Sequence, residues 1–187
     1  MVKLTRIFTG GGDKGKTSLG DGTRVAKHDL RVAAIGAVEE ANAAIGLARL
    51  HGGGELDEIL ARAQNDLFDL GGDLCTPERE NPERPPLRIT AEQVARLERE
   101  IERNNAELAP LDSFVLPGGT PAAAHLHLAR CMARRAEREI TALAAREMLN
   151  PEAVRFINRL SDLFFVLSRR ANDGGAKDVL WVAGANR

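Results

Sequence analysis

Residues 120–148 read TPAAAHLHLARCMARRAEREITALAAREM, and this stretch decides the fold class. Thr120 fits the N-cap of a helix, and Pro121 takes the first helical position, where a proline loses no hydrogen bond. Small and aliphatic side chains then recur every three or four residues, which predicts a long helix that ends near Met148. The members of this apolar stripe are Leu126, Ala129, Ala133, Ala136, Ile140 and Leu143.

Four further segments repeat the helical period. They start near Leu30, Glu55, Thr90 and Asn150. Glycines 52–54 separate the first two, and Thr90 with Gln93 forms a capping box for the next. The last segment runs to about Asn172. Five helices with short connections and no strong series of strands predict an all-α five-helix bundle with an ordered glycine-rich N-terminal loop.

The composition excludes several classes of protein. The chain has 187 residues, 26 basic and 27 acidic, with a formal net charge of −1, which argues against general nucleic-acid binding. No apolar run approaches the ~20 residues that span a bilayer, and the N-terminus has no apolar signal core. Cys75 and Cys131 cannot form a disulfide framework in a chain of this size. We therefore expect one soluble, cytoplasmic domain.

Arginine dominates the basic residues, because only five of the 26 are lysines. Arginine suits planar, bidentate contacts with phosphate or carboxylate, although a high content can also reflect genome composition. In the helix predicted over 120–148, Arg130, Arg134 and Glu137 lie within about 60° of one another beside the apolar stripe, and Arg135 and Arg138 extend the cluster. This arginine cluster indicates an anionic ligand, a subunit interface or a salt-bridged surface, and the sequence leaves these three interpretations open.

Residues 10–17, GGGDKGKT, match the P-loop pattern G-x-x-x-x-G-K-[ST]. We reject a P-loop fold because the following SLGDGT does not begin a helix and no parallel strands follow. The segment still offers backbone N–H groups, positive charge and hydroxyls that suit an anion. The charge comes from Lys14, Lys16 and Lys27, and the hydroxyls come from Thr17 and Ser18. A flexible glycine-rich arm is the alternative. We also expect a short strand at Thr5–Thr9.

The last predicted helix carries a second polar stripe that includes an aromatic ring. Its members are Asn158, Asp162, Phe165 and Arg169, and they indicate either a lined pocket or a solvated face. His127 and Cys131 are four residues apart, but no further ligands with suitable spacing complete a metal site. No nucleophile elbow is present, which fits a reaction in which the cofactor itself attacks.

Several motifs in order resemble one family. They are Thr9–Gly22 (TGGGDKGKTSLGDG), Arg31–Gly46 (RVAAIGAVEEANAAIG), Phe114–Gly119 (FVLPGG), Arg130–Arg138 (RCMARRAER) and Leu149–Asn172 (LNPEAVRFINRLSDLFFVLSRRAN). Nearly the whole chain resembles the PduO-type ATP:cob(I)alamin adenosyltransferases. The resemblance implies a ferritin-like five-helix bundle that forms a homotrimer with active sites between subunits.

The resemblance also implies a reaction. Cob(I)alamin would attack the ribose 5′-carbon of ATP, with Mg²⁺ on the phosphates, giving adenosylcobalamin and tripolyphosphate. A reductase and a B12-dependent mutase are possible partners. Residues 1–28 would form the nucleotide-binding loop, 29–173 the bundle and 174–187 a tail. The alternatives are a P-loop-type phosphotransferase and a non-catalytic cobalamin carrier or helical adaptor.

Site residues follow from the same resemblance. The N-terminal loop would wrap ATP with Thr9, Gly10, Gly11, Gly12, Lys14, Thr17, Ser18 and Lys27. The bundle would complete the nucleotide site with Arg134, Arg135, Glu137, Arg138 and Asn158. On the corrinoid side, Phe114 would displace the lower cobalamin ligand, and Asp162 and Phe165 would line the pocket. Of these residues, Arg134, Phe114 and Glu137 would be catalytic.

The resemblance also predicts an intersubunit contact between Arg130 and an acid of the first helix. That acid is Glu39 here, where the family has aspartate, so the contact is expected at a changed angle. Ala41 stands where the family has leucine, and Ile35 stands where it has tyrosine. Gly10–Gly12 replaces bulkier residues, which is expected to loosen the loop.

Overall fold

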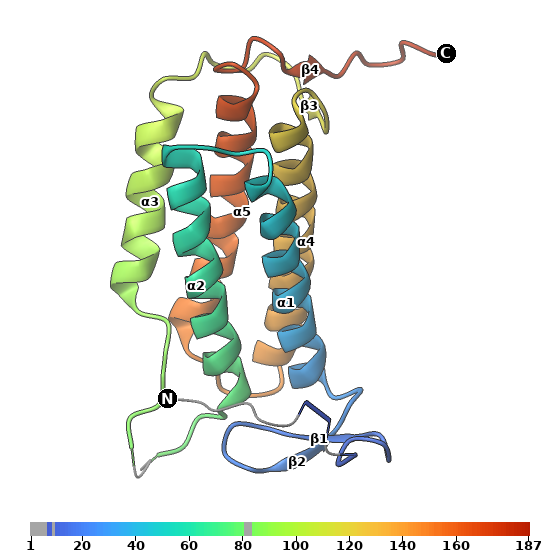
Figure 1. Ribbon diagram of the computed structural model, residues 1–187, viewed down its shortest axis with the longest axis vertical. Helices are drawn as coiled ribbons and strands as arrows, with labels where there is room; N and C mark the ends of the chain where they lie inside the picture. Colours follow the sequence, from blue (N-terminus) through green and yellow to red (C-terminus); the bar gives the residue numbers. More distant parts are fainter. Residues whose placement is uncertain (1–6, 9, 81–83) are drawn as a thin grey trace.

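The computed structural model describes residues 7–8, 10–80 and 84–187. These residues form five α-helices, which confirms the predicted all-α bundle (Figure 1). The helices are α1 (Leu30–Arg49), α2 (Glu55–Cys75), α3 (Ala91–Asn105), α4 (Pro121–Ala144) and α5 (Pro151–Ala171). Helix α4 packs between α1 and α5, while α2 packs on α1 and α3 on α5. Pairs α1–α4 and α4–α5 therefore form the centre of the bundle.

Side chains cap the helices where the sequence predicts. Thr90 and Gln93 form both hydrogen bonds of a capping box, and Thr120 accepts from the N–H of Ala123. Asn150 caps α5 in the same way. These local bonds fix where each helix begins, because they satisfy N–H groups that the first helical turn leaves free.

Helix α4 ends at Ala144, four residues before the predicted end near Met148. The chain turns there because the N–H groups of Arg146 and Glu147 both return to the carbonyl of Leu143. The turn carries the carboxylate of Glu147 to the buried guanidinium of Arg31 at the start of α1. The end of α4 is thus set by a contact with a distant part of the chain.

Two short antiparallel ladders lie at opposite ends of the bundle (Figure 1). Antiparallel strands β1 (Lys16–Ser18) and β2 (Arg24–Ala26) pair within the glycine-rich N-terminal segment. At the other end, β3 (Val115–Leu116) pairs with β4 (Val179–Leu180). Neither ladder was predicted, since two or three residues are too few for a period-two pattern. The strand predicted at Thr5–Thr9 lies mostly outside the described residues.

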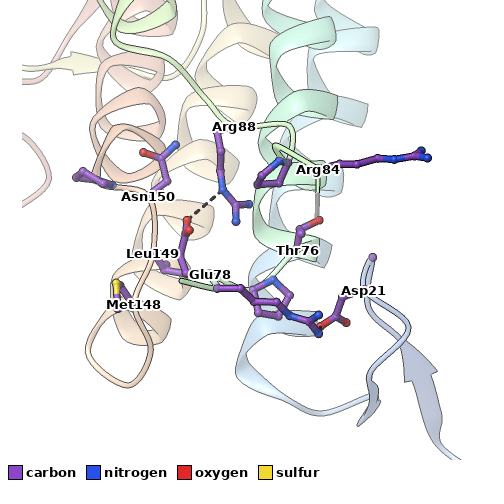
Figure 2. Close-up of a pocket in the computed structure, with 13 residues that line it drawn as sticks. Asp21, Thr76, Glu78, Arg84, Arg88, Met148, Leu149 and Asn150 are labelled. Atoms are coloured by element: carbon purple, nitrogen blue, oxygen red, sulfur yellow. Dashed lines mark hydrogen bonds and ion pairs between the residues drawn. The ribbon is translucent and has the colours of Figure 1, made fainter. Parts of the chain in front are cut away.

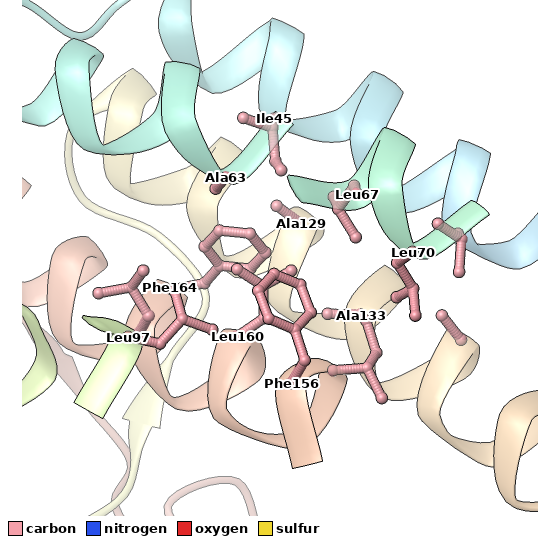
Figure 3. Packing of buried hydrophobic residues seen from close by; sticks show 14 of the residues in the cluster. Ile45, Ala63, Leu67, Leu70, Leu97, Ala129, Ala133, Phe156, Leu160 and Phe164 are labelled. Atoms are coloured by element: carbon pink, nitrogen blue, oxygen red, sulfur yellow. The ribbon is translucent and has the colours of Figure 1, made fainter. Parts of the chain in front are cut away.

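Small side chains on α4 allow the helices to approach closely. Figure 3 shows Ala129 and Ala133 facing the rings of Phe156 and Phe164 on α5, and all four are fully buried. Every member of the predicted apolar stripe on α4 is likewise buried. Within the described residues, no helix has the length and hydropathy needed to cross a bilayer.

Candidate functional site

The outer edge between α4 and α5 gathers four of the predicted site residues. Asn158 donates from Nδ2 to Oε1 of Glu137 at 2.7 Å, which joins the two helices. Partial burial raises the pKa of Asp162 above its ordinary value; the positive charges of Arg159 and Arg134 oppose this shift, and Glu137 adds to it. The structure therefore brings the predicted polar residues of the two helices into contact, while their role in a nucleotide site stays a prediction.

The same edge carries guanidinium groups that have no carboxylate partner. Arg130, Arg134 and Arg138 make no ion pair within 4.0 Å with any described residue, whereas Arg159 and Arg169 nearby are paired. Nε of Arg130 is buried without a hydrogen-bond partner. Unpaired guanidinium groups beside one another favour an anionic ligand, because each presents a planar set of donors.

Arg135 points away from this edge, although it is adjacent to Arg134 in the sequence. Its guanidinium pairs with Glu40 of α1, on the side of α4 that faces that helix. A step of one residue turns a helix by about 100°, which separates the two arginines. Glu39 is exposed on α1 and forms no ion pair with a described residue. Its predicted contact with Arg130 across a subunit interface stays a prediction.

Phe165 lies at the same edge, half-buried, with the ring of His127 packed edge-on against it at 6.4 Å between centroids. His127 is 1% exposed, and neither of its ring nitrogens has a hydrogen-bond partner in the described structure. Burial lowers the pKa of His127 below its ordinary value; Arg130 lowers it further, and Asp178 opposes this. Sequence reasoning did not assign His127 to the site, since its spacing indicated only a poor metal ligand.

The lowered pKa of His127 predicts a pH dependence of stability. Below pH 6.5, its ordinary pKa, the unfolded chain takes up a proton before the folded chain does. The free energy of unfolding should therefore fall as the pH drops below that value, by up to about 1.4 kcal/mol per pH unit from this group. Urea titrations at several pH values should show a shallower dependence for His127→Gln. His28→Gln, at an exposed position, is the matched control, and an unchanged slope in the His127 variant would contradict the assignment.

Phe114 is 77% exposed in the loop before α4, at the end of the bundle where the C-terminal tail lies (Figure 1). Its ring meets the ring of Trp181 at 6.0 Å between centroids, and its carbonyl accepts from the Trp181 N–H at 2.8 Å. An exposed aromatic ring held by its backbone is available to a flat apolar ligand.

The glycine-rich segment forms tight turns and not an extended arm. Gly10 has a φ of +70°, and its carbonyl accepts from the Asp13 N–H at 3.2 Å. The Lys27 side chain lies so close to Gly12 that a Cβ there would be 3.0 Å from Nζ. Lys14 and Ser18 are exposed, Thr17 is half-buried in β1, and Thr9 lies outside the described residues.

One arginine that the sequence reasoning missed holds this segment together. The guanidinium of Arg24 donates to Ser18 Oγ at 3.2 Å and to the Gly11 carbonyl at 2.7 Å. Arg24 is directly opposite Ser18 in the β1–β2 ladder, a relation visible only once the hairpin is recognised. Because Thr17 lies in a strand and not at the start of a helix, the segment is not a P-loop.

The structure does not bring all predicted residues together in one chain. The N-terminal hairpin and Phe114 lie at opposite ends of the bundle (Figure 1). Among the described residues, the hairpin's polar contacts with the bundle go from Gly20 to Cys75 and from Asp21 to Arg79. No hydrogen bond or ion pair between described residues joins the glycine loop to the α4–α5 edge, so these two parts of the predicted nucleotide site are not in polar contact within one chain.

A cavity of about 990 Å³ lies between the hairpin, the α2–α3 loop and the α4–α5 turn (Figure 2). Two of its three arginines are paired, since Arg79 pairs with Asp21 and Arg88 pairs with Asp73 and Glu78, whereas Arg84 forms no ion pair with a described residue. None of the predicted site residues lines it. Size alone therefore does not make it the substrate site.

Comparison with known proteins gives consistent results. A family model described as cobalamin adenosyltransferase matches residues 7–171. A corrinoid adenosyltransferase of Mycobacterium tuberculosis is 51% identical, over 100% of this chain and 97% of its own length. The corrinoid adenosyltransferase PduO of Salmonella typhimurium is 41% identical, over 91% of this chain and 50% of its own length.

Solved structures agree with these relatives. A PduO-type ATP:corrinoid adenosyltransferase from Lactobacillus reuteri, a phenylalanine-to-alanine variant complexed with cobalamin and ATP, superimposes with a TM-score of 0.87. It is 38% identical and covers 94% of this chain and 99% of its own. A second structure from the same organism, an arginine-to-lysine variant complexed with ATP, gives a TM-score of 0.85 at 36% identity, over 94% of this chain and 100% of its own.

Proposed function

The chain belongs to the cobalamin adenosyltransferase family and is an ATP:corrinoid adenosyltransferase, and from this premise we propose which of its residues carry the reaction. The arrangement of polar side chains at the α4–α5 edge is the observation that best supports the assignment of these residues. There Arg134 has no ion-pair partner among the described residues, and Glu137 and Asn158 are joined at 2.7 Å. We assign the phosphates of ATP to this edge.

In the proposed reaction the substrate supplies the nucleophile. Cob(I)alamin attacks the ribose 5′-carbon, the carbon–oxygen bond to the phosphate chain breaks, and the electron pair leaves with tripolyphosphate. The two electrons of the new cobalt–carbon bond come from cobalt(I). The protein then needs only to position the reactants and to stabilise the departing negative charge, which suits the unpaired guanidinium of Arg134.

We propose that the nucleotide site is completed by a neighbouring subunit of a homotrimer. The glycine loop would come from one chain and the α4–α5 edge from the next, with Lys14, Thr17, Ser18 and Lys27 against the nucleotide. Two observations support this arrangement: described residues of the two parts make no polar contact with one another in a single chain, and the buried Nε of the half-exposed Arg130 lacks a partner in the described structure. Glu39 of the adjacent subunit is the acid that we assign to Arg130.

We further propose that Mg²⁺ arrives bound to the phosphates of ATP. Among the described residues no three His, Cys, Asp or Glu side chains group to hold a metal ion, and Mg²⁺ is commonly held by substrate phosphates plus one or two carboxylates. Glu137 is the carboxylate that we assign to it. The bound ion would neutralise charge on the leaving tripolyphosphate.

We also propose that the protein works in the cytoplasm, that a physiological reductase serves it, and that a mutase receives its product. The two cysteines are free, which fits a reducing compartment. Cobalt(II) must be reduced before it can attack, so a one-electron donor is required on chemical grounds.

One anaerobic assay separates the possible functions. With ATP and chemically reduced cobalamin, adenosylcobalamin and tripolyphosphate should appear together in equal amounts. Release of ADP would favour a phosphotransferase, and corrinoid binding without product would favour a carrier. Either result would overturn the proposed chemistry.

We assign Phe114 to the displacement of the lower cobalamin ligand, which eases reduction of cobalt(II). Phe114→Ala should therefore slow the reaction that starts from cob(II)alamin and a reductant far more than the reaction that starts from cob(I)alamin. Stopped-flow absorbance under anaerobic conditions measures both rates. Phe68→Ala, which removes an equally exposed phenylalanine from α2, is the control, and equal losses from both starting states would contradict the assignment.

A further inference from the structure

The loop that carries Phe114 is tied to the chain that follows α5, and Asp178 is at the centre of this connection. The carboxylate of Asp178 is 3% exposed and accepts from Nε of Arg169 at 2.7 Å. Its other oxygen accepts from Nδ2 of Asn172 at 3.0 Å. A buried carboxylate with two side-chain donors is held in one geometry.

The two partners of Asp178 also hold both ends of the Phe114 loop. Arg169 donates to the Ala109 carbonyl at 2.9 Å, at the start of the loop. Asn172, fully buried, donates to the Gly118 carbonyl at 3.2 Å and accepts from the Thr120 N–H at 2.9 Å, at its end. The loop and the tail therefore share the same two anchoring side chains on α5.

Close packing at this point requires a glycine. Gly119 has a φ of +93°, and a Cβ there would come within 2.1 Å of Oδ1 of Asn172. Asn172 can reach both flanks of this residue only because Gly119 has no side chain. The end of the loop is thus fitted to Asn172.

Beyond Asp178 the tail runs directly along the loop. Val179 pairs with Leu116 and Leu180 with Val115 in the β3–β4 ladder. The Ser113 hydroxyl then donates to the Trp181 carbonyl at 2.6 Å. Isolated two-stranded pairs are marginally stable in water, so a ladder of two residues needs an anchor.

We propose that Asp178 is a positioning residue for Phe114, acting through Arg169, Asn172 and the short ladder. The carboxylate fixes the tail, and the tail fixes the backbone from which the Phe114 ring projects. The role of Phe114 in the reaction rests on the proposed function; the mechanical connection does not. Sequence reasoning assigned neither Asp178 nor Trp181 to the site.

A spectroscopic test uses Trp181, the only tryptophan of the chain. Asp178→Asn keeps the shape of the side chain but removes the charge, and its amide presents a donor where the carboxylate had an acceptor. Emission from Trp181 should shift to the red as the tail leaves Phe114, while far-UV circular dichroism retains the helical signal. Lys177→Ala, at the adjacent exposed position, is the matched control and should leave the emission unchanged.

The kinetic test separates positioning from general damage. Asp178→Asn should slow the reaction from cob(II)alamin and reductant by roughly tenfold to a hundredfold, since misplacement by about 1 Å can cost about 10²-fold. The reaction from cob(I)alamin should lose much less. In a Phe114→Ala background, Asp178→Asn should not slow the reaction from cob(II)alamin any further relative to the reaction from cob(I)alamin. The reason is that Asp178 acts through Phe114.

A second variant covers the case in which Asp178→Asn does not fold. Ser113→Ala removes one contact between loop and tail without disturbing the buried ion pair, and should shift both readouts in the same direction by less. An unmoved emission spectrum with an unchanged ratio of the two rates would overturn the proposal. Absence of adenosylcobalamin with the unaltered protein would instead overturn the proposed function. The fluorescence of Asp178→Asn would still show whether Asp178 holds the tail against the Phe114 loop.

Discussion

Arg134→Ala is expected to abolish adenosyl transfer while the protein still folds and assembles. The side chain is exposed on α4, and no described residue pairs with its charge, so its removal leaves no buried group unsatisfied. Loss of one preorganised donor aimed at a developing negative charge typically costs about 10²–10³-fold in rate. Anaerobic turnover with ATP and cob(I)alamin measures the loss.

The control for Arg134 is an arginine of similar exposure away from the site. Arg99→Ala on α3 removes an exposed guanidinium that pairs with Glu92, and it should retain full activity. Arg134→Lys should fall between the two, since lysine keeps the charge and loses the planar set of donors. A normal rate in Arg134→Ala, with an unchanged elution volume on size exclusion, would contradict the assignment of the phosphates to the α4–α5 edge.

Phe156→Ala is expected to cause the largest loss of stability of any change considered. Its ring is fully buried on α5 against the small residues of α4 (Figure 3). Truncation of a buried phenylalanine removes its transfer free energy and leaves a cavity, which together cost about 3–5 kcal/mol. At roughly 2–4 °C per kcal/mol for a chain of this size, the melting temperature should fall by about 6–20 °C.

Phe68 offers the matched control for this change, because it is 78% exposed on α2. Phe68→Ala should alter the free energy of unfolding by no more than about 0.5 kcal/mol. Chemical denaturation at one fixed protein concentration measures both variants, so that assembly contributes equally. A loss below about 1 kcal/mol at Phe156 would show that the interior closes around the missing ring.

The helices could be predicted from the sequence because their determinants are local. The caps at Thr90, Thr120 and Asn150 act within three residues, and the α4 stripe repeats within one turn. The end of α4 could not be predicted in the same way. It depends on Glu147 reaching Arg31, a contact between residues that only the folded bundle brings together.

The candidate site likewise has some features that follow from local sequence and others that depend on distant contacts. Helical spacing placed Glu137 and Asn158 on polar faces, and the packing of α4 on α5 joined them. No local pattern could show that Arg135 would pair with Glu40 while Arg134 forms no ion pair with a described residue, because that depends on which helix packs against each side. Nor could it show that Asp178 lies beneath the Phe114 loop, since the β3–β4 ladder joins distant residues.

The absence of polar contact between the described residues of the glycine loop and the α4–α5 edge within one chain has a genetic consequence for the proposed trimer. A subunit with a damaged Arg134 still contributes a sound loop to one neighbour, and a subunit with a damaged Lys27 still contributes a sound helical edge to the other. Two alleles that are each inactive alone should therefore complement one another when they are expressed in the same cell, because mixed trimers contain an interface at which both sound halves meet. Two alleles that damage the same half of the site would not complement one another, because no interface in a mixed trimer would then have both halves intact. The pattern of complementing alleles would therefore map which residues act in trans.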